Sequence, residues 1–470
     1  MSSHDPPRAW RWAFVLAALA VSATMVVRSR PSGDQLELLA RGWLLAERGE
    51  LVPWGNPLSS GGLAPGPATS WAVGLPLEIW RDHRAPAAAI WLLHLGALLV
   101  LDRALRPALT PIERTAYLVL WTVVPWRLEA SGFVWNPNYL FAVGAIHLAS
   151  AEASRERPSF AATFLHVATL GVAAQLHPSV LLLGVLSALL WWRGLVRPSW
   201  SGFAAGVAVS AVALLPWLLA PAMASSSDAG TRGFLFRGLV LVQPWLKGLS
   251  YWLRYPALSS SSSSVRFDFT ETFGSSVDAW STPAALGLAI AAGVATVAFA
   301  GWANWRWLRE AGAYFRKPWR GGPPRDWLSA YAFWALVAMA LVFAASPTTP
   351  QGWQGFPLFH ATLVPVVFGI GALVPRWGER RVMAGLAAAG VAALAIDAAI
   401  AFGAPNFRCT GRHSDPFPLR AWSPMFFDLG IQRDCPRTLG VAGGWWPSVL
   451  PEEAPRSPGE AGEAPSSRNQ

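Results

Sequence analysis

Long apolar runs recur along almost the whole chain, and they constrain its fold more than any other feature. Many of them are about 16–23 residues long, which is enough for a helix to cross the hydrocarbon core of a bilayer. Charged residues occupy only 14% of the 470 positions, whereas a soluble domain carries about a quarter. The sequence therefore predicts an all-α polytopic membrane protein.

The apolar runs predict about eleven transmembrane helices. A secretory signal peptide is the rival interpretation of the first run, but its length favours a membrane helix. Many of the 28 Trp residues stand where apolar runs end, as in an aromatic belt at the membrane surface. The expected spans are residues 10–27, 86–105, 115–128, 137–152, 160–175, 178–193, 201–222, 281–303, 327–345, 357–374 and 382–403.

The distribution of Arg predicts an orientation. With the N-terminus in the cytoplasm, every second connection is short and basic, as the positive-inside rule requires. The chain is then expected in an inner (plasma) membrane with its C-terminus outside. A net charge of +10 would suggest a nucleic acid partner in a soluble protein, but here it marks cytoplasmic loops, and no nucleic acid is expected. The basic inside segments contain Arg8 and Arg11; Arg103, Arg106 and Arg114; Arg155 and Arg157; Arg193 and Arg197; Arg306 to Arg325; and Arg376, Arg380 and Arg381.

This topology divides the chain into three parts. Residues 1–403 form a multispanning domain with two long outer loops, about 29–84 and 223–280. Residues 404–450 form an outer C-terminal segment, and the Pro/Glu/Ser-rich residues 451–470 are expected to be disordered. Cys409 and Cys435 would lie in an oxidising compartment. We expect a disulfide worth about 3 kcal/mol, and two free buried thiols are the alternative.

The start of the first outer loop carries the main catalytic candidate. Asp34 stands where a helix is expected to begin, and Glu37 follows at the spacing of a capping box. Apolar residues at helical spacing then predict an amphipathic helix along the membrane surface to about Glu47. A carboxylate held at that boundary can accept a proton from an incoming hydroxyl. Helix capping alone explains Asp34 equally well.

A Gly/Pro-rich segment, residues 53–67, follows this helix. Its composition argues against regular structure and is typical of a loop that lines a cavity. It is not a nucleotide-binding loop, because no Lys-Ser/Thr pair follows the glycines.

These features resemble the GT-C glycosyltransferases that use polyprenyl-phosphate sugars, a group that includes protein O-mannosyltransferases and aminoarabinose transferases. The matching residues are Gly33-Asp34-Gln35, the helix to about Glu47, and the segment 55–67. The resemblance implies a large first outer loop with amphipathic juxtamembrane helices. It also implies sugar transfer at the outer face with inversion, and Asp34 as the base. The family often has a second acid where this chain has Gln35.

Further outer turns supply candidate substrate-binding residues: Glu37, Asn136, His177, Arg232 and Arg237. Arg binds phosphate oxygens through charge-assisted hydrogen bonds, and His binds a phosphate oxygen or a sugar hydroxyl. Structural alternatives exist for each group. Asn136 suits a helix cap, His177 precedes a Pro in a turn, and the Arg-containing segment suits an interfacial helix.

No Cys/His cluster has zinc spacing and acidic residues near Asp34 are few, so no metal is predicted. No cofactor is expected beyond the lipid-linked donor. The expected partners are this donor, a glycan, lipid or protein acceptor, and membrane lipids. Two other functions remain open: a polysaccharide polymerase or ligase, and a transporter or flippase for a lipid-linked substrate.

Overall fold

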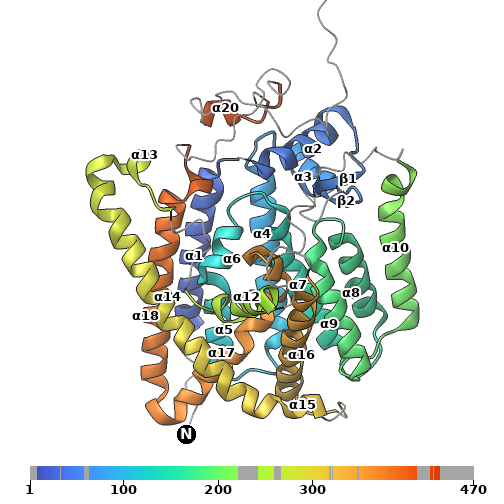
Figure 1. Ribbon diagram of the computed structural model, residues 1–470, viewed down its shortest axis with the longest axis vertical. Coiled ribbons are helices and arrows are strands. Elements are labelled where there is room, and N and C mark those ends of the chain that lie inside the picture. The colour runs from blue at the N-terminus through green and yellow to red at the C-terminus, as the bar shows by residue number, and fades with distance from the viewer. Residues whose placement is uncertain are drawn as a thin grey trace, which may run out of the picture.

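The computed structural model describes residues 8–31, 33–57, 63–220, 242–258, 266–316, 319, 321–346, 349–409, 424–426 and 428–434. The predicted helical bundle is confirmed (Figure 1). Every predicted span has a helix at its position: α1 (Arg8–Arg28), α4 (Ala85–Leu105), α5 (Pro111–Val123), α7 (Leu140–Ala153), α8 (Phe160–Ala173), α9 (Leu181–Trp192), α10 (Trp200–Leu219), α14 (Ser275–Ala311), α16 (Pro324–Ala344), α17 (Phe359–Trp377) and α18 (Glu379–Gly403).

Within the described part of the chain, seven helical segments are long and apolar enough to cross a membrane: α1, α4, α10, α14, α16, α17 with the short helix before it, and α18. The protein is therefore an integral membrane protein. α5, α7, α8 and α9 are shorter, with 12–14 residues each.

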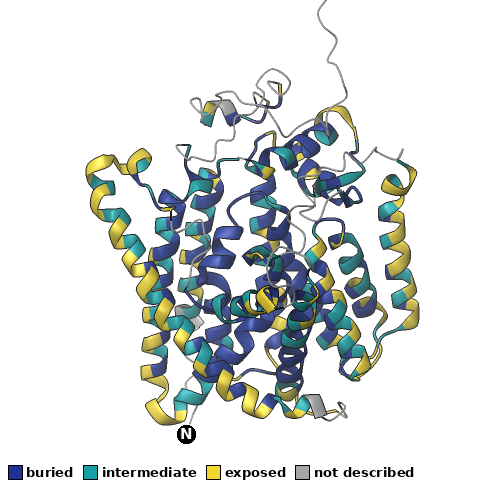
Figure 2. Cartoon of the chain, viewed as in Figure 1, coloured by how far each residue is buried: buried dark blue, intermediate teal, exposed yellow. Residues whose placement is uncertain are grey.

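Burial differs strongly between these helices (Figure 2). α16 and α17 form the centre of the bundle, and 67% and 72% of their apolar windows are buried. Only 11% of the corresponding window of α10 is buried, and its Val212 and Leu219 are largely exposed. Lipid tails are as apolar as these side chains, so contact with lipid is as favourable for them as burial inside the protein. The outer helices thus present a lipid-facing surface.

The expected continuous span 115–128 is wrong, because the helix breaks at Val124. Pro125 has no N–H for the helix ladder and disfavours a helical conformation at the residue before it. Val124 is accordingly extended (φ −68°, ψ 126°), and a separate short helix, α6 (Pro125–Ala130), follows. This break turns α6 away from the axis of α5.

The expected first outer loop forms a layer at the top of the view in Figure 1. The predicted surface helix is present as α2 (Asp34–Arg48) and packs closely on α3 (Ala68–Ile79). The expectation of irregular structure between them is wrong in part. β1 (Trp54–Pro57) pairs antiparallel with β2 (Leu63–Pro65). The turn after β2 needs Gly66, whose φ is +89° and whose missing Cβ would lie 2.1 Å from Gln175 Oε1.

The expected second outer loop contains the amphipathic helix α12 (Val242–Arg254), which packs on α14 and α16, and the short helix α13 (Thr270–Phe273). Two 3₁₀ helices lead into α7 and α17: η1 (Asn136–Tyr139) and η4 (Gly352–Leu358). η2 (Pro178–Val180) leads into α9, and η5 (Pro405–Phe407) follows α18.

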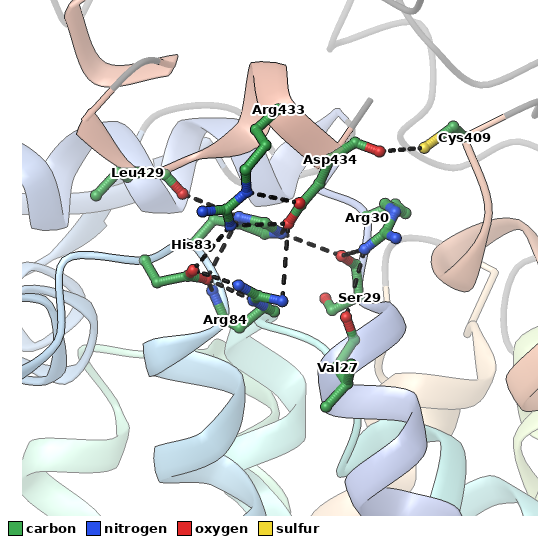
Figure 3. Close-up of polar contacts among 10 residues, drawn as sticks. Val27, Ser29, Arg30, His83, Arg84, Cys409, Leu429, Arg433 and Asp434 are labelled. Carbon is green, nitrogen blue, oxygen red and sulfur yellow. Dashed lines mark hydrogen bonds and ion pairs between the residues drawn. The ribbon is translucent and has the colours of Figure 1, made fainter. Parts of the chain in front are cut away.

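The C-terminal segment folds back onto the first outer loop. Met425, Phe426 and Leu429 are buried in one apolar cluster with residues of α2 and α3. Trp43 donates from its indole N–H to Asp428 (3.1 Å). The backbone N–H of His83 donates to the Leu429 carbonyl (3.0 Å), and the His83 ring also lies beside that oxygen (Figure 3).

Cys409 is disulfide-bonded, as predicted. The other Cys of the sequence, Cys435, lies outside the described residues, as do the expected disordered residues 451–470.

Charged residues surround this docking contact. Arg84 pairs with Asp82 and lies 3.8 Å from Asp434, while Arg433 lies 3.4 Å from Asp82. Partial burial works against ionisation of Asp82, but hydrogen bonds from Arg84 and the attraction of nearby positive charges together outweigh it and lower the pKa of Asp82. The pKa of Asp434 is also lowered: burial opposes ionisation, and the bond from Arg433 together with nearby positive charges outweighs it. Both carboxylates therefore stabilise the docked segment when ionised.

We predict that docking weakens in acid. A carboxylate with a depressed folded pKa contributes stability above its unfolded pKa of about 4 and loses it as pH falls through the folded value. The melting temperature of the purified protein should therefore fall below about pH 4. Asp82→Asn should lower the melting temperature at pH 7 and flatten its acid dependence. An unchanged acid dependence in that variant would contradict this assignment.

Candidate functional site: a cavity beside Asp34

A cavity of about 340 Å³ lies between the start of α2 and the helices that face it. Its walls come from segments far apart in sequence: α2, α6, η1, α12, η4 and η5. Most of these are short helices or turns at the ends of the long helices. The lining residues are Asp34, Gln35, Trp126, Glu129, Ala130, Phe133, Trp135, Asn138, Tyr251, Arg254, Gln351, Gly352, Trp353, Phe356 and Asn406.

Asp34 is the first residue of α2. The N-cap position is Gly33, at φ 50° and ψ −126°, and no side chain caps the helix. The expected capping box is therefore wrong. The Asp34 side chain is exposed, and within the described part of the chain its carboxylate makes no hydrogen bond or ion pair. The positive end of the helix dipole favours a negative charge at this position. The site thus offers an accessible carboxylate.

A second carboxylate and a guanidinium line the same cavity. Glu129 comes from α6 and is only 3% exposed. Arg254 ends α12, and its guanidinium carbon lies 5.5 Å from the Trp126 ring and 5.0 Å from the Tyr251 ring. The break at Pro125 places Trp126 and Glu129 in the cavity wall. The cavity therefore combines two acids with one fixed cation.

Aromatic rings form much of the remaining wall. The rings of Trp135 and Trp353 are 5.0 Å apart, and the rings of Trp126 and Phe356 are 6.2 Å apart. Flat apolar faces with a few polar groups between them are typical of small-molecule sites. The C–H faces of a sugar ring suit such a wall, while its hydroxyls suit the amides and acids.

Glu37 faces away from this arrangement. It pairs with Arg41 one turn further along α2, and Arg41 is fully buried and also donates to Asn56 Oδ1 at 2.8 Å. Burial raises the pKa of Glu37 and lowers the pKa of Arg41, while each charge counteracts the shift of the other. The pair links α2 to the hairpin of β1 and β2. Its geometry is that of a structural contact.

Asn136 and His177 lie in the expected turns but do not line the cavity with Asp34. The Asn136 amide donates to Thr69 Oγ1 in α3 (3.2 Å). His177 Nδ1 accepts a hydrogen bond from the Ser179 backbone N–H (3.2 Å) and so caps η2. The His177 side chain is only partly exposed. Burial lowers the pKa of His177 to about 4. Substrate binding by either residue stays a prediction.

Arg232 and Arg237 lie outside the described residues. Arg254, in the same basic and aromatic stretch of the sequence, does line the cavity. Sequence reasoning missed Gln351, Trp353 and Asn406. Gln351 and Trp353 stand in a Gly/Pro-containing turn before an apolar run, which is the pattern that marked the other turns. No local pattern marks Asn406.

Among the described residues, no group of three or more His, Cys, Asp or Glu side chains could hold a metal ion.

Comparison with known proteins gives no family model and no curated protein that matches this chain. Solved structures align over most of its length. ArnT from Cupriavidus metallidurans bound to undecaprenyl phosphate aligns over 82% of this chain and 64% of its own, with 17% identity and a TM-score of 0.49. An Archaeoglobus fulgidus oligosaccharyltransferase tethered to an acceptor peptide aligns over 90% of this chain and 59% of its own, with 12% identity and a TM-score of 0.48.

This chain thus spans less than two thirds of either protein. Alignments at these identities and TM-scores do not establish an activity.

We predict that Glu37→Gln destabilises the protein. It leaves the fully buried Arg41 charge without its partner, and breaking a buried ion pair from one side costs about 3–5 kcal/mol. The measurement is the free energy of unfolding, or the melting temperature, of the variant in detergent.

The matched control replaces both partners, as Glu37→Leu with Arg41→Met. Removing both charges avoids the unpaired guanidinium, so the double variant should be more stable than Glu37→Gln. If Glu37→Gln keeps full stability and loses only substrate affinity, Glu37 is a binding residue instead.

Proposed function

We propose that this protein transfers a sugar from a polyprenyl-phosphate donor to an acceptor hydroxyl or amine at the outer face of the membrane. One observation carries the proposal. The accessible carboxylate of Asp34 shares an aromatic-lined cavity with the Arg254 guanidinium. The Asp34 carboxylate is suited to activating an acceptor, and the Arg254 guanidinium is suited to binding a phosphate.

The proposed reaction is a single displacement. Asp34 takes the proton of the acceptor group as its oxygen or nitrogen attacks the anomeric carbon of the donor. The bond from that carbon to the phosphate oxygen breaks, and polyprenyl phosphate leaves with the bonding electrons. Arg254 stabilises the negative charge that grows on the phosphate. Attack from the face opposite the leaving group inverts the anomeric configuration.

The aromatic wall supports the sugar part of the proposal. Trp126, Trp135 and Trp353 offer apolar faces for the ring, while Asn138 and Gln351 offer amides for its hydroxyls. The lipid part follows from the setting of α12. This amphipathic helix exposes Trp245 and Leu246, and it ends at Arg254. A donor could therefore keep its chain in the bilayer while its phosphate reaches Arg254.

We predict that Asp34→Asn abolishes transfer. The amide has nearly the shape of the carboxylate but cannot accept the acceptor proton, so the rate should fall at least about 100-fold. The measurement is transfer of radiolabelled sugar from polyprenyl phosphate in membranes that contain the protein. The variant should keep wild-type expression and melting temperature, since Asp34 is exposed and makes no cap bond.

The same assay separates the alternatives. Full transfer by Asp34→Asn would remove the assigned base. Movement of the lipid-linked sugar without transfer would identify a flippase, and growth of a glycan chain would identify a polymerase.

The proposed side of the reaction requires a cytoplasmic N-terminus and an external C-terminus. In Figure 1, α1 begins at the end of the bundle opposite α2 and α3. We predict that alkaline phosphatase fused after residue 434 is active and that the same enzyme fused into the turn after Leu105 is inactive. The reverse pattern would put the cavity in the cytoplasm.

A further inference from the structure

Asn406, in the short helix η5 after α18, holds the segment on both sides of Asp34. The backbone carbonyl of Asn406 accepts a hydrogen bond from the backbone N–H of Arg30 (2.8 Å). Its side-chain Oδ1 accepts another from Gln35 Nε2 (3.2 Å). Arg30 precedes Asp34 in the chain and Gln35 follows it directly. One residue, 371 positions from Gln35 in the sequence, thus fastens both ends of the segment that carries the catalytic candidate.

Asn406 is itself held firmly. Its neighbour Phe407 is fully buried and packs on Phe133, with the rings 6.1 Å apart. The preceding turn of α18 is tied to α1, because Arg28 donates to the Ala401 carbonyl (3.0 Å). On the other side, the Cys409 N–H donates to the Glu271 carboxylate (2.7 Å). Asn406 therefore presents its two acceptors from a fixed position.

A second contact reaches the same segment from the α3–α4 turn. Nε2 of His83 lies 3.2 Å from the Ser29 carbonyl, while Nδ1 of the same ring lies 3.0 Å from the Leu429 carbonyl (Figure 3). The ring thereby joins the end of α1 to the docked C-terminal segment. The chain around Asp34 is thus held by hydrogen bonds at residues 29 and 30 before it and at residue 35 after it.

This fastening is needed because the local sequence does not orient Asp34. Gly33 has a φ of 50°, and because Gly adopts positive and negative φ about equally well, this residue does not fix the backbone conformation. α2 begins without a side-chain cap. The backbone bond from the Leu36 N–H to the Gly33 carbonyl (3.0 Å) is therefore not reinforced by a capping side chain, and an uncapped first turn frays more readily. A catalytic group displaced by 1 Å loses about 100-fold in rate. The bond between Asn406 and Gln35 supplies the missing constraint.

We propose that Asn406 is a positioning residue that orients Asp34 through its side-chain hydrogen bond to Gln35. This inference rests on the proposed function for its kinetic consequence. Its structural consequence, an ordered first turn of α2, does not depend on which reaction the protein catalyses.

The kinetic test compares Asn406→Leu, Gln35→Leu and the double variant in the sugar-transfer assay. Each single variant removes the same bond and leaves the backbone bond to Arg30 intact. We expect kcat to fall about 10- to 100-fold in each, with a smaller change in the KM for the donor. The double variant should lose no more than the worse single one. Asn406→Asp keeps the acceptor oxygen and should recover most of the lost rate.

The structural test is hydrogen exchange of the backbone amides at residues 33–38. Asn406→Leu and Gln35→Leu should speed exchange there at least about tenfold, because the first turn frays more often. The matched control is Asp102→Asn, which removes a bond to Arg114 between α4 and α5. It should leave both kcat and this exchange unchanged.

The outcomes separate the two proposals. Wild-type kcat in Asn406→Leu, or losses that multiply in the double variant, would overturn the positioning role. Unchanged exchange at 33–38 would overturn it as well. If the wild-type protein transfers no sugar, the proposed function fails, and the exchange experiment still decides whether Asn406 orders this turn.

Discussion

A bilayer does not solvate unpaired charge, and this constraint decides where chemistry can take place in the protein. The centre of the bundle is made of apolar side chains from α16 and α17. The cavity residues come instead from helix ends and turns: the start of α2, the short helix α6, and the 3₁₀ helices η1, η4 and η5. At these positions a chain can expose an acid or an amide to water. The long helices then act as the scaffold that holds these ends together.

One group of polar side chains inside the bundle is joined by hydrogen bonds, which low dielectric surroundings favour. His147 in α7 bonds Tyr331 in α16 (2.8 Å) and Ser187 in α9 (2.9 Å). Tyr331 also bonds His360 in α17 (2.8 Å), and Ser187 bonds His166 in α8 (2.8 Å). This network joins five helices by side-chain bonds. It contributes specificity to helix packing, where apolar contacts alone discriminate poorly between registers.

Much of the fold was readable from the chain because hydrophobicity and breaker residues act locally. The apolar runs located the helices, and the acid before an amphipathic pattern located the start of α2. Hydropathy alone does not reveal every break. The apolar run 115–128 predicts one span, whereas Pro125, a helix breaker visible in the sequence, divides it into α5 and α6. The hairpin of β1 and β2 forms in a segment whose Gly/Pro content argues against regular structure, and Gly66 after β2 packs against Gln175, which is distant in sequence.

The sequence by itself determined that the chain crosses a membrane, roughly where its helices lie, and that Asp34 stands at the start of a surface helix. These properties follow from hydropathy and helix signals within a few residues of each position. Only the tertiary structure decided which groups share a cavity with Asp34. Arg254 and Asn406 come from α12 and η5, and no local pattern links them to α2. Their meeting depends on how the helices pack, and packing is a property of side-chain contacts between distant segments.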